Sequence, residues 1–575
     1  MKKIIRKLSF GPTILAIAFM IIQVFADLYL PTLTSDIINK GVAKGNINYI
    51  WQTGFLMVGF SLFGIIASLG NTYFAIKESQ KLGRNLRSEI FKKVESLSVS
   101  AFDQFGTASL ITRTTNDVTQ VQMVVQVFLC LMINAPIMLI GASLMAYNKD
   151  PQLTKIFFIV LPLMGGLVGT ILYFAVPLFK TVQRKMDRLN LVFREGLTGV
   201  RVIRSFVRTD YEEQRFKEAN RGYTETAIKV NTLISIMIPL MTIIMSITSI
   251  LIMWFGAHYV AQQKLEVGNL IAFMTYAMQS LMSFIMLAMI FIMVPRAQAS
   301  AERINEILEA EDVVLDSKNL EKFPDNQGQV SLIFDHVNYC YKGAEDSALT
   351  DISFSLVSGN RMAVIGGTGS GKTTLVSLAL RFYDSTSGEI CINGQNIGSV
   401  AQEELRQRIS FVPQKSVLFS GTIRENMQYG YPKASDEEIW KALRVAQADS
   451  FVSELTNGLD TWVEQGGNNF SGGQKQRLAI ARALIKPADI YIFDDSFSAL
   501  DFKTDAKLRA ALKMELVKAV VIIVAQRVST VMDASEILVL DEGKIVGKGK
   551  HEELYRSNET YREIVQSQLG EGEAM

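Results

Sequence analysis

Long apolar runs alternate with charged segments over the first half of the chain and stop near Pro295. A membrane-spanning helix needs roughly 20 mostly apolar residues, because it crosses about 30 Å of hydrocarbon at about 1.5 Å per residue. Lipid offers the backbone no hydrogen-bond partners, so such runs predict helices rather than open strands. Six runs of this kind can be read: Pro12–Leu30, Trp51–Phe74, Val125–Tyr147, Ile156–Phe179, Leu233–Phe255 and Leu270–Val294.

Cationic side chains gather in three of the segments that flank these runs. The N-terminal segment carries Lys2, Lys3, Arg6 and Lys7, and the connections after the second and the fourth run are long and rich in lysine and arginine. The other connections are short and hold few cations. Because lysine and arginine are retained on the cytoplasmic side, the sequence predicts a multi-pass protein of the cell membrane with both termini in the cytoplasm.

The two long connections repeat apolar residues at helical spacing, as at Leu86, Ile90 and Val94. We therefore expect the membrane helices to continue far into the cytoplasm and to turn back there. A short segment at each turn, near Phe102–Leu110 and near Phe206–Glu213, is a candidate for contact with a cytoplasmic domain. An ordinary amphipathic loop helix is the alternative for each.

Composition agrees with a chain that is half membrane-embedded and half soluble. Hydrophobic residues make up 49% and charged residues 20%, which is too apolar for an average soluble protein and too charged for one buried wholly in lipid. The net charge of +2 gives no sign of a nucleic-acid partner. The three cysteines (Cys130, Cys340, Cys391) are too few and too far apart to predict a disulfide framework or a metal site.

Asp27 is an acid inside the first apolar run. Ionisable side chains in membrane helices often line the path of a substrate. Asp27 lies toward the far end of its run, however, and solvation at the aqueous rim is the interpretation that the sequence favours.

A glycine-rich loop follows the strand-like run Arg361–Ile365. It consists of Gly366, Gly367, Thr368, Gly369, Ser370, Gly371, Lys372, Thr373 and Thr374. A first glycine, four variable positions and then Gly-Lys-Thr match the phosphate loop of nucleotide-binding proteins. The glycines let the backbone aim its amides at phosphate oxygens, at the start of a helix whose dipole favours anions. We expect Lys372 to neutralise the outer phosphates and Thr373 to coordinate Mg²⁺.

Two further segments suit nucleotide chemistry. The buried-strand run Ile490–Phe493 ends in Asp494 and Asp495, where a magnesium ligand belongs in phosphoryl-transfer proteins of this kind. Between the two acids and the phosphate loop lies a second flexible helix start, formed by Ser471, Gly472, Gly473 and Gln474. One nucleotide has room for one phosphate loop, so this second start should serve a nucleotide bound to another subunit.

With these motifs the chain resembles an ATP-binding-cassette (ABC) exporter half-transporter of the multidrug type over essentially its whole length. The resemblance implies an α-helical membrane domain with six transmembrane helices, like that of a type I ABC exporter, and an α/β P-loop NTPase domain. It places the membrane domain at 1–300, a connector at 301–329 and the nucleotide-binding domain at 330–570. The implied cofactors are ATP and Mg²⁺.

The same resemblance implies further residue roles. Tyr341 matches the aromatic that stacks on adenine, and Gln414 matches the glutamine that links magnesium to the membrane domain. Asp501 ends the loop Ser498–Asp501, which in the family crosses the dimer seam. There, two cassettes close head-to-tail around two ATP molecules, and each site combines one chain's phosphate loop with the other chain's signature, here Ser471–Gln474. Closure drives alternating access in the membrane helices.

Three positions depart from the family pattern. Asp495 stands where the family has the glutamate that positions the attacking water, Gln526 stands where it has histidine, and Gln465 replaces a glutamate just before the signature. Aspartate is one methylene shorter, and a general base must be within hydrogen-bond reach. Gln526 can donate a hydrogen bond but carries neither a proton to transfer nor a charge. These departures predict an impaired site of the chain's own.

The hypothesis that follows is ATP-driven multidrug export by a heterodimer, whose second half-transporter supplies the missing glutamate and histidine. Methionines such as Met278, Met282 and Met286 suit adaptable apolar surfaces, which favours amphipathic or hydrophobic small molecules as cargo. The expected surroundings are the lipid bilayer, with no nucleic acid. The alternatives are a slow homodimer, a lipid or peptide exporter, a non-transporting ATP-sensing regulator, and a soluble ATPase tethered by unrelated helices.

Overall fold

The computed structural model describes residues 2–310, 314–316, 319–324 and 329–569, side chains at 2, 172, 288–292, 295–296 and 569 excepted. The chain folds as two compact units. The first comprises Met1–Ser96 and Gly106–Ala310, and the second comprises Leu97–Phe105 and Glu311–Met575. The predicted connector at 301–329 lies in part outside the described residues.

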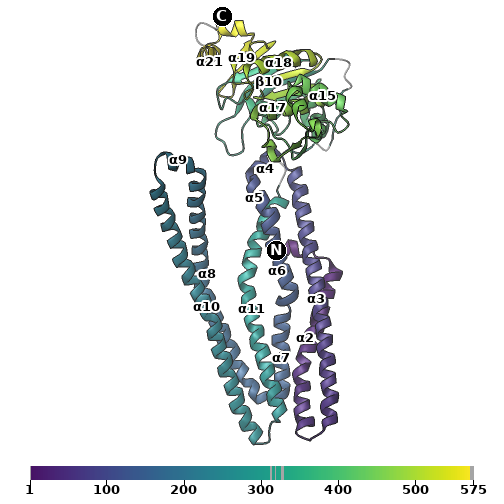
Figure 1. Ribbon diagram of the computed structural model, residues 1–575, viewed down its shortest axis with the longest axis vertical. Coiled ribbons are helices and arrows are strands. Elements are labelled where there is room, and N and C mark those ends of the chain that lie inside the picture. The colour runs from purple at the N-terminus through teal and green to yellow at the C-terminus, as the bar shows by residue number, and fades with distance from the viewer. Residues whose placement is uncertain (1, 311–313, 317–318, 325–328, 570–575) are drawn as a thin grey trace. The chain divides into compact units, whose positions relative to one another are not determined.

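The first unit is entirely helical in the part of it that the structure describes (Figure 1). Three short π-helical segments, Ile37–Val42, Arg113–Asp117 and Phe128–Met132, interrupt its helices. Its α-helices are α1 (Lys2–Ile5), α2 (Phe10–Asp36), α3 (Ile47–Ser96), α5 (Thr107–Thr112), α6 (Val118–Val127), α7 (Asn134–Lys149), α8 (Pro151–Thr198), α9 (Val200–Ser205), α10 (Thr209–Ala261) and α11 (Val267–Leu308).

The predicted six membrane helices are confirmed. Six helical stretches within the described residues are long and apolar enough to span a bilayer: Phe10–Val42, Ile47–Ser96, Thr107–Lys149, Pro151–Thr198, Thr209–Ala261 and Val267–Leu287. Three of them, α3, α8 and α10, have 50, 48 and 53 residues. At about 1.5 Å per residue each is more than twice as long as the roughly 30 Å of hydrocarbon. The extension predicted from the periodic connections is therefore present.

The helices of the first unit pack in pairs, α2 with α3, α7 with α11 and α8 with α10. Helices α8 and α10 bury Met164 and Met241 against Leu281 of α11. Toward α9 the pair α8–α10 leans away from the other helices of its unit (Figure 1). In the turn between α9 and α10, Phe206 is 73% exposed and Val207 is 86% exposed.

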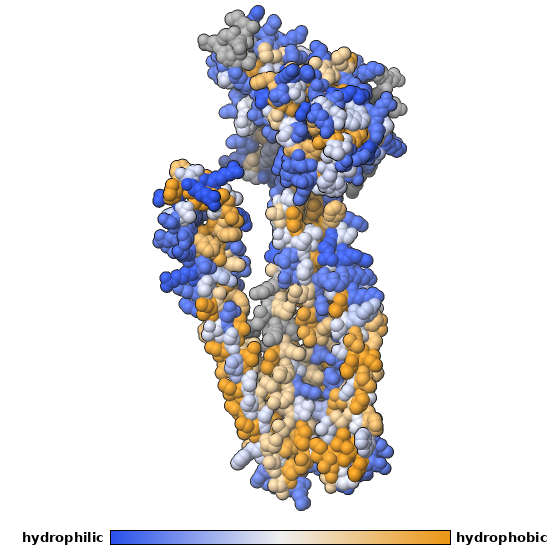
Figure 2. All heavy atoms as spheres, viewed as in Figure 1, coloured by the Kyte–Doolittle hydropathy of each residue, from blue (hydrophilic) through white to orange (hydrophobic). Residues whose placement is uncertain are grey.

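Large apolar side chains remain exposed along the membrane helices, among them Phe158, Ile159 and Trp254. Figure 2 shows these helices as mostly apolar over the lengths away from α9, whereas hydrophilic and apolar residues are mixed around α9. A water-soluble surface does not expose apolar side chains over such lengths. This pattern is the one expected of helices whose middle lengths face lipid.

The second unit contains two main sheets. A six-stranded sheet has the order β12-β11-β3-β10-β9-β6 and is parallel except for β12, and a four-stranded antiparallel sheet has the order β2-β1-β4-β5. The strands are β1 (Ser331–Tyr339), β2 (Leu349–Val357), β3 (Arg361–Gly366), β4 (Ser387–Ile392), β5 (Gln395–Asn396), β6 (Ile409–Val412), β7 (Gly421–Thr422), β8 (Trp462–Val463), β9 (Ile490–Asp494), β10 (Val520–Val524), β11 (Glu536–Asp541) and β12 (Lys544–Gly549).

Helices cover the parallel sheet and bury its central strands. All five residues of β9 and all five of β10 are buried, which explains their unbroken apolar sequences. The α-helices of this unit are α4 (Val99–Phe105), α12 (Lys372–Ala379), α13 (Gln402–Arg408), α14 (Ile423–Gln428), α15 (Asp436–Val445), α16 (Asp449–Glu454), α17 (Gly472–Ile485), α18 (Phe502–Glu515), α19 (Val528–Val531), α20 (His551–Ser557) and α21 (Glu559–Leu569). The α/β class predicted for this half is confirmed.

Candidate nucleotide-binding site

Four neighbouring parallel strands bring the predicted site residues to one edge of the sheet. The phosphate loop follows β3, Gln526 follows β10, Asp494 ends β9, and Gln414 follows β6. Ligands of open α/β sheets bind outside the carboxyl ends of the strands. Residues separated by more than 150 positions in sequence therefore meet because their strands are neighbours in the sheet.

The phosphate loop has a backbone that only glycine suits at two of its positions. Gly369 and Gly371 adopt φ of 86° and 98°, in the left-handed region. A Cβ on Gly366 would lie 2.1 Å from the Leu540 carbonyl oxygen. The loop leads directly into α12, whose first residue is Lys372. These constraints form a concave backbone at a helix start, which suits a phosphate group.

Lys372 is the buried cation of this loop. Its Nζ donates to the carbonyl oxygens of Gly366 and Gly367 at 2.9 and 2.6 Å. Burial lowers the pKa of the ammonium, while Asp495 and Asp494 nearby act in the opposite direction. A desolvated lysine beside two carboxylates is well placed to exchange carbonyl partners for phosphate oxygens.

The donor set next to Lys372 fits Mg²⁺. Asp494 is 2% exposed, burial raises the pKa of its carboxyl, and a hydrogen bond from Thr373 opposes that rise. A carboxylate and a hydroxyl are the hard oxygen ligands that Mg²⁺ takes alongside phosphates. A bound ion would neutralise phosphate charge. We expect Thr373 and Asp494 to hold it, with Gln414 as a third oxygen donor.

Asp495 follows β9 in a left-handed backbone conformation, with φ of 44°. Its Oδ2 accepts hydrogen bonds from Gln414 Nε2 at 3.3 Å and from Gln526 Nε2 at 3.2 Å. Burial raises the pKa of this carboxyl, and the bond from Gln414 opposes the rise. Two of the departures noted in the sequence, Asp495 and Gln526, are thus in direct contact.

Tyr341 lies close to the phosphate-loop helix. Its hydroxyl and that of Thr374 are 3.0 Å apart, and its ring makes edge contacts with Tyr339 and Tyr383. Tyr341 is 40% exposed, so the residue has surface left for a ligand. The sequence did not single out Tyr339 and Tyr383, although they support the ring predicted to stack on adenine.

The signature Ser471–Gln474 begins α17 with a capping box. The Ser471 N–H donates to Gln474 Oε1 at 2.8 Å, and the Gln474 N–H donates to Ser471 Oγ at 3.3 Å. Ser471 and Gly472 are exposed. Among the described residues, the near neighbours of Gly472 and Gly473 are Ala499 and Leu500 rather than the phosphate loop.

The loop Ser498–Asp501, called the seam loop below, is held from two sides. Buried Gln476 of α17 accepts a hydrogen bond from the Ala499 N–H at 3.1 Å. Arg527 donates to the carbonyl oxygens of Ser498 and Leu500 at 2.8 and 3.2 Å. Asp501 is exposed and caps α18. The sequence reasoning missed Gln476 and Arg527, because neither role has a sequence signal of its own.

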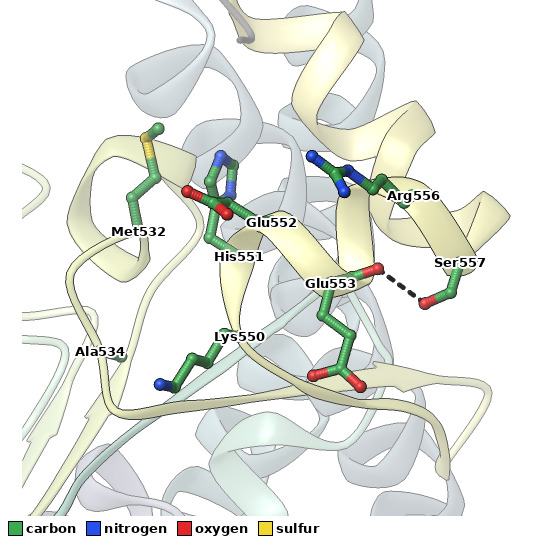
Figure 3. A pocket seen from close by; sticks show the side chains of 8 residues that line it. All are labelled: Met532, Ala534, Lys550, His551, Glu552, Glu553, Arg556 and Ser557. Atoms are coloured by element: carbon green, nitrogen blue, oxygen red, sulfur yellow. Dashed lines mark hydrogen bonds between the residues drawn. The ribbon is translucent and has the colours of Figure 1, made fainter.

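A surface cavity of about 770 Å³ lies elsewhere in this unit (Figure 3). It is lined by Met532, Ala534, Lys550, His551, Glu552, Glu553, Arg556 and Ser557. None of the predicted nucleotide residues lines it. Cavity size therefore does not locate the candidate site, which is a concave backbone surface at the sheet edge.

Comparison with known families finds one matching family model for each half of the chain. A family model described as the ABC transporter transmembrane region matches residues 13–293, and one described as ABC transporter matches residues 349–498. The chain belongs to the ABC transporter family.

Several similar proteins match over nearly the full length. An uncharacterised ABC transporter ATP-binding protein of Mycobacterium tuberculosis (strain CDC 1551 / Oshkosh) is 39% identical, over 95% of this chain and 94% of the relative. An ATP-dependent lipid A-core flippase of Mannheimia succiniciproducens is 30% identical, over 97% and 95%. A bacterial Atm1-family ABC exporter solved with ATP bound has a TM-score of 0.80 at 26% identity, covering 97% of this chain and 98% of that one.

The chain is therefore an ABC exporter half-transporter with a membrane domain and a cassette that binds ATP. Hydrolysis of ATP by the cassette is coupled to transport across the membrane. The roles assigned above to individual site residues stay predictions.

Proposed function

We propose that this half-transporter works in a heterodimer in which its own phosphate-loop site holds ATP but hydrolyses it poorly. The observation that carries the proposal is that two side-chain amides donate hydrogen bonds to the Asp495 carboxylate. Gln414 and Gln526 both donate to Oδ2, so one oxygen of an already short carboxylate is engaged by neutral donors. A displacement on the order of 1 Å from the attacking water costs about 100-fold in rate.

The intact parts of the cassette support a partner that completes the other site. Ser471 and Gly472 are exposed at the start of a 14-residue helix. Among the described residues, the near neighbours of Gly472 do not include the chain's own phosphate loop. Phe206 and Val207, at the turn between α9 and α10, present apolar surface that a cytoplasmic domain of the partner would cover. The partner proposed is a second ABC half-transporter with glutamate and histidine at the two altered positions.

The proposed cargo is an amphipathic or hydrophobic small molecule. Met278, Met282 and Met286 are exposed on one face of α11, which suits adaptable apolar binding. Polar groups lie beside that face, where Gln279 Nε2 donates to the Asp27 carbonyl at 3.4 Å and Gln279 Oε1 is buried with no recorded partner among the described residues. Asp27 lies nine residues before the end of α2, on the helix that Gln279 contacts.

The proposed topology follows from the charges. The basic N-terminal segment and the long extensions α3, α8 and α10 would lie in the cytoplasm of the cell, together with the cassette and Mg²⁺-ATP.

Purifying the chain with and without its partner tests the heterodimer. The chain alone is expected to bind ATP and to turn it over at least about tenfold more slowly than the assembled pair. A robust ATPase in the isolated chain that Asp495→Asn abolishes would refute the proposal and establish a homodimer with a working aspartate.

Uptake by inside-out vesicles that contain the assembled exporter tests the cargo. ATP-dependent accumulation of a cationic amphipathic dye is expected, with loss in Lys372→Ala. Asp27→Asn should reduce uptake of that dye more than uptake of a neutral analogue, with Asp36→Asn on the same helix as the matched control. The relative named as a lipid A-core flippase makes lipid the second candidate, and flipping of a fluorescent lipid without dye uptake would favour it.

A further inference from the structure

The last described helix, α21, contacts the segment that carries Gln526. Tyr561 and Val565 are fully buried and fix the helix to the cassette. Gln568, near the end of α21, is exposed and directs its amide at the backbone of the segment Gln526–Val528, called the switch segment here. Gln568 itself lies outside every family motif found in the sequence.

Gln568 makes two hydrogen bonds that span one residue. The Val528 N–H donates to Gln568 Oε1 at 2.8 Å, and Gln568 Nε2 donates to the Gln526 carbonyl oxygen at 2.7 Å. Val528 begins α19, so its N–H has no partner within that helix. Arg527 provides no side-chain cap there. The amide oxygen of Gln568 therefore caps α19, and its amide nitrogen binds the carbonyl of Gln526, on the other side of Arg527.

The switch segment reaches two places that matter for hydrolysis. Gln526 donates to Asp495 at 3.2 Å, next to the phosphate loop of this chain. Arg527 donates to Ser498 and Leu500 of the seam loop and lies 5.4 Å from the ring centre of Phe502. A backbone shift of the switch segment would move both side chains together.

Other side-chain hydrogen bonds of α21 lead to α20. Among the described residues, Gln568 is the side chain of α21 that bonds to the switch segment. His551 Nδ1 and the Tyr561 hydroxyl are 2.8 Å apart, and Arg562 donates to the carbonyl oxygens of Tyr555 and Arg556. These bonds join α21 to α20. Beyond the switch segment, Met532 and Ala534 border the open cavity of Figure 3 together with residues of α20.

We propose that Gln568 is a positioning residue for ATP hydrolysis, through which α21 sets the placement of Gln526 and Arg527. It touches no nucleotide itself. By holding both ends of the switch segment it keeps Gln526 on Asp495 and Arg527 on the seam loop. The inference rests on the proposed nucleotide roles of these two places, and it applies whether the partner is a different chain or a second copy.

The test compares Gln568→Leu with Gln566→Leu in the assembled exporter. Gln566 is exposed on the same helix but two residues away, which places it on a different side. Gln568→Leu is expected to lower kcat of the assembled exporter on the order of tenfold, because Arg527 would release the seam loop and small displacements near the chemistry are costly. KM for ATP should stay within about twofold, because Tyr341 and the phosphate loop are untouched. Gln566→Leu should match the wild type.

A second variant keeps the proposal falsifiable if Gln568→Leu does not fold. The carboxylate introduced by Gln568→Glu accepts from the Val528 N–H but cannot donate to the Gln526 carbonyl, whereas the protonated acid can do both. The ratio of its turnover to that of the wild type should therefore rise as the pH falls from about 8 toward about 5, nearer the ordinary glutamate pKa of about 4.3.

Three results would overturn the inference. They are turnover by Gln568→Leu equal to the wild type, an equal loss in Gln566→Leu, and a flat pH ratio for Gln568→Glu. The heterodimer proposal is tested separately, by the ATPase activity of the isolated chain. Its failure would not affect this comparison, because the wild type and these variants are always measured in the same assembly.

Discussion

At the carboxyl edge of the parallel sheet, Asp495 and Gln526 stand where the family has glutamate and histidine, whereas at the start of α17 the signature is intact and capped. The two regions belong to one cassette but would serve different nucleotides. Under the proposed heterodimer, a change in Asp495 or Gln526 would act mainly on the chain's own site, and a change at the signature would act on the partner's.

The largest expected effect comes from breaking the intact region. Gly472→Asp would place a carboxylate beside a γ-phosphate bound by the partner and should lower turnover of the assembled exporter on the order of 1,000-fold. A Cβ at this position meets only the Ala499 Cβ at 4.0 Å, so the variant has room to fold. Gly472→Ala is the matched control, with a much smaller loss. Steady-state ATPase activity measures both, and an undiminished rate in Gly472→Asp would end the shared-site interpretation.

Restoring the altered region is expected to have a smaller, opposite effect. Asp495→Glu combined with Gln526→His should raise hydrolysis at this chain's own site by about 100-fold, because the longer carboxylate regains reach to the attacking water. Single-turnover hydrolysis in an assembly with an inactivated partner site would measure it. Asp495→Glu alone serves as the control. If the double variant is no faster than the wild type, the impairment does not lie in this pair.

The smallest effect concerns stability without nucleotide. The pKa of Asp495 is raised by burial, so the folded chain binds this proton more tightly than the unfolded chain. Stability should therefore fall as the pH rises from about 4 through the raised value. Asp495→Asn lacks this titration, and its Tm relative to the wild type should increase by about 1–2 °C between pH 4 and pH 8. Calorimetry showing a constant difference across that range would contradict the desolvated carboxylate.

Much of the fold was predictable because its signals are local. Length and hydropathy indicate the six membrane helices, and the apolar runs before Gly366 and Asp494 indicate buried strands. The phosphate loop could be recognised for the same reason, since its chemistry depends on glycines within nine consecutive residues. Boundaries such as those of the predicted connector depend on packing and stay predictions.

The contacts among site residues were not predictable in the same way. Gln414, Asp495 and Gln526 are far apart in sequence, and their common hydrogen-bonded cluster depends on the order β10-β9-β6 in the sheet. Gln476, Arg527 and Gln568 act through backbone carbonyls and amides, which any residue supplies, so no motif marks their partners.

The sequence by itself determined the class of this protein, because membrane spanning and phosphate binding are imposed by short-range chemistry that is written in consecutive residues. Only the tertiary structure decided that the two altered residues touch each other and that a glutamine on the last described helix binds both sides of Arg527. Such contacts depend on which strands and helices become neighbours, and burial of apolar faces across the whole cassette sets that choice.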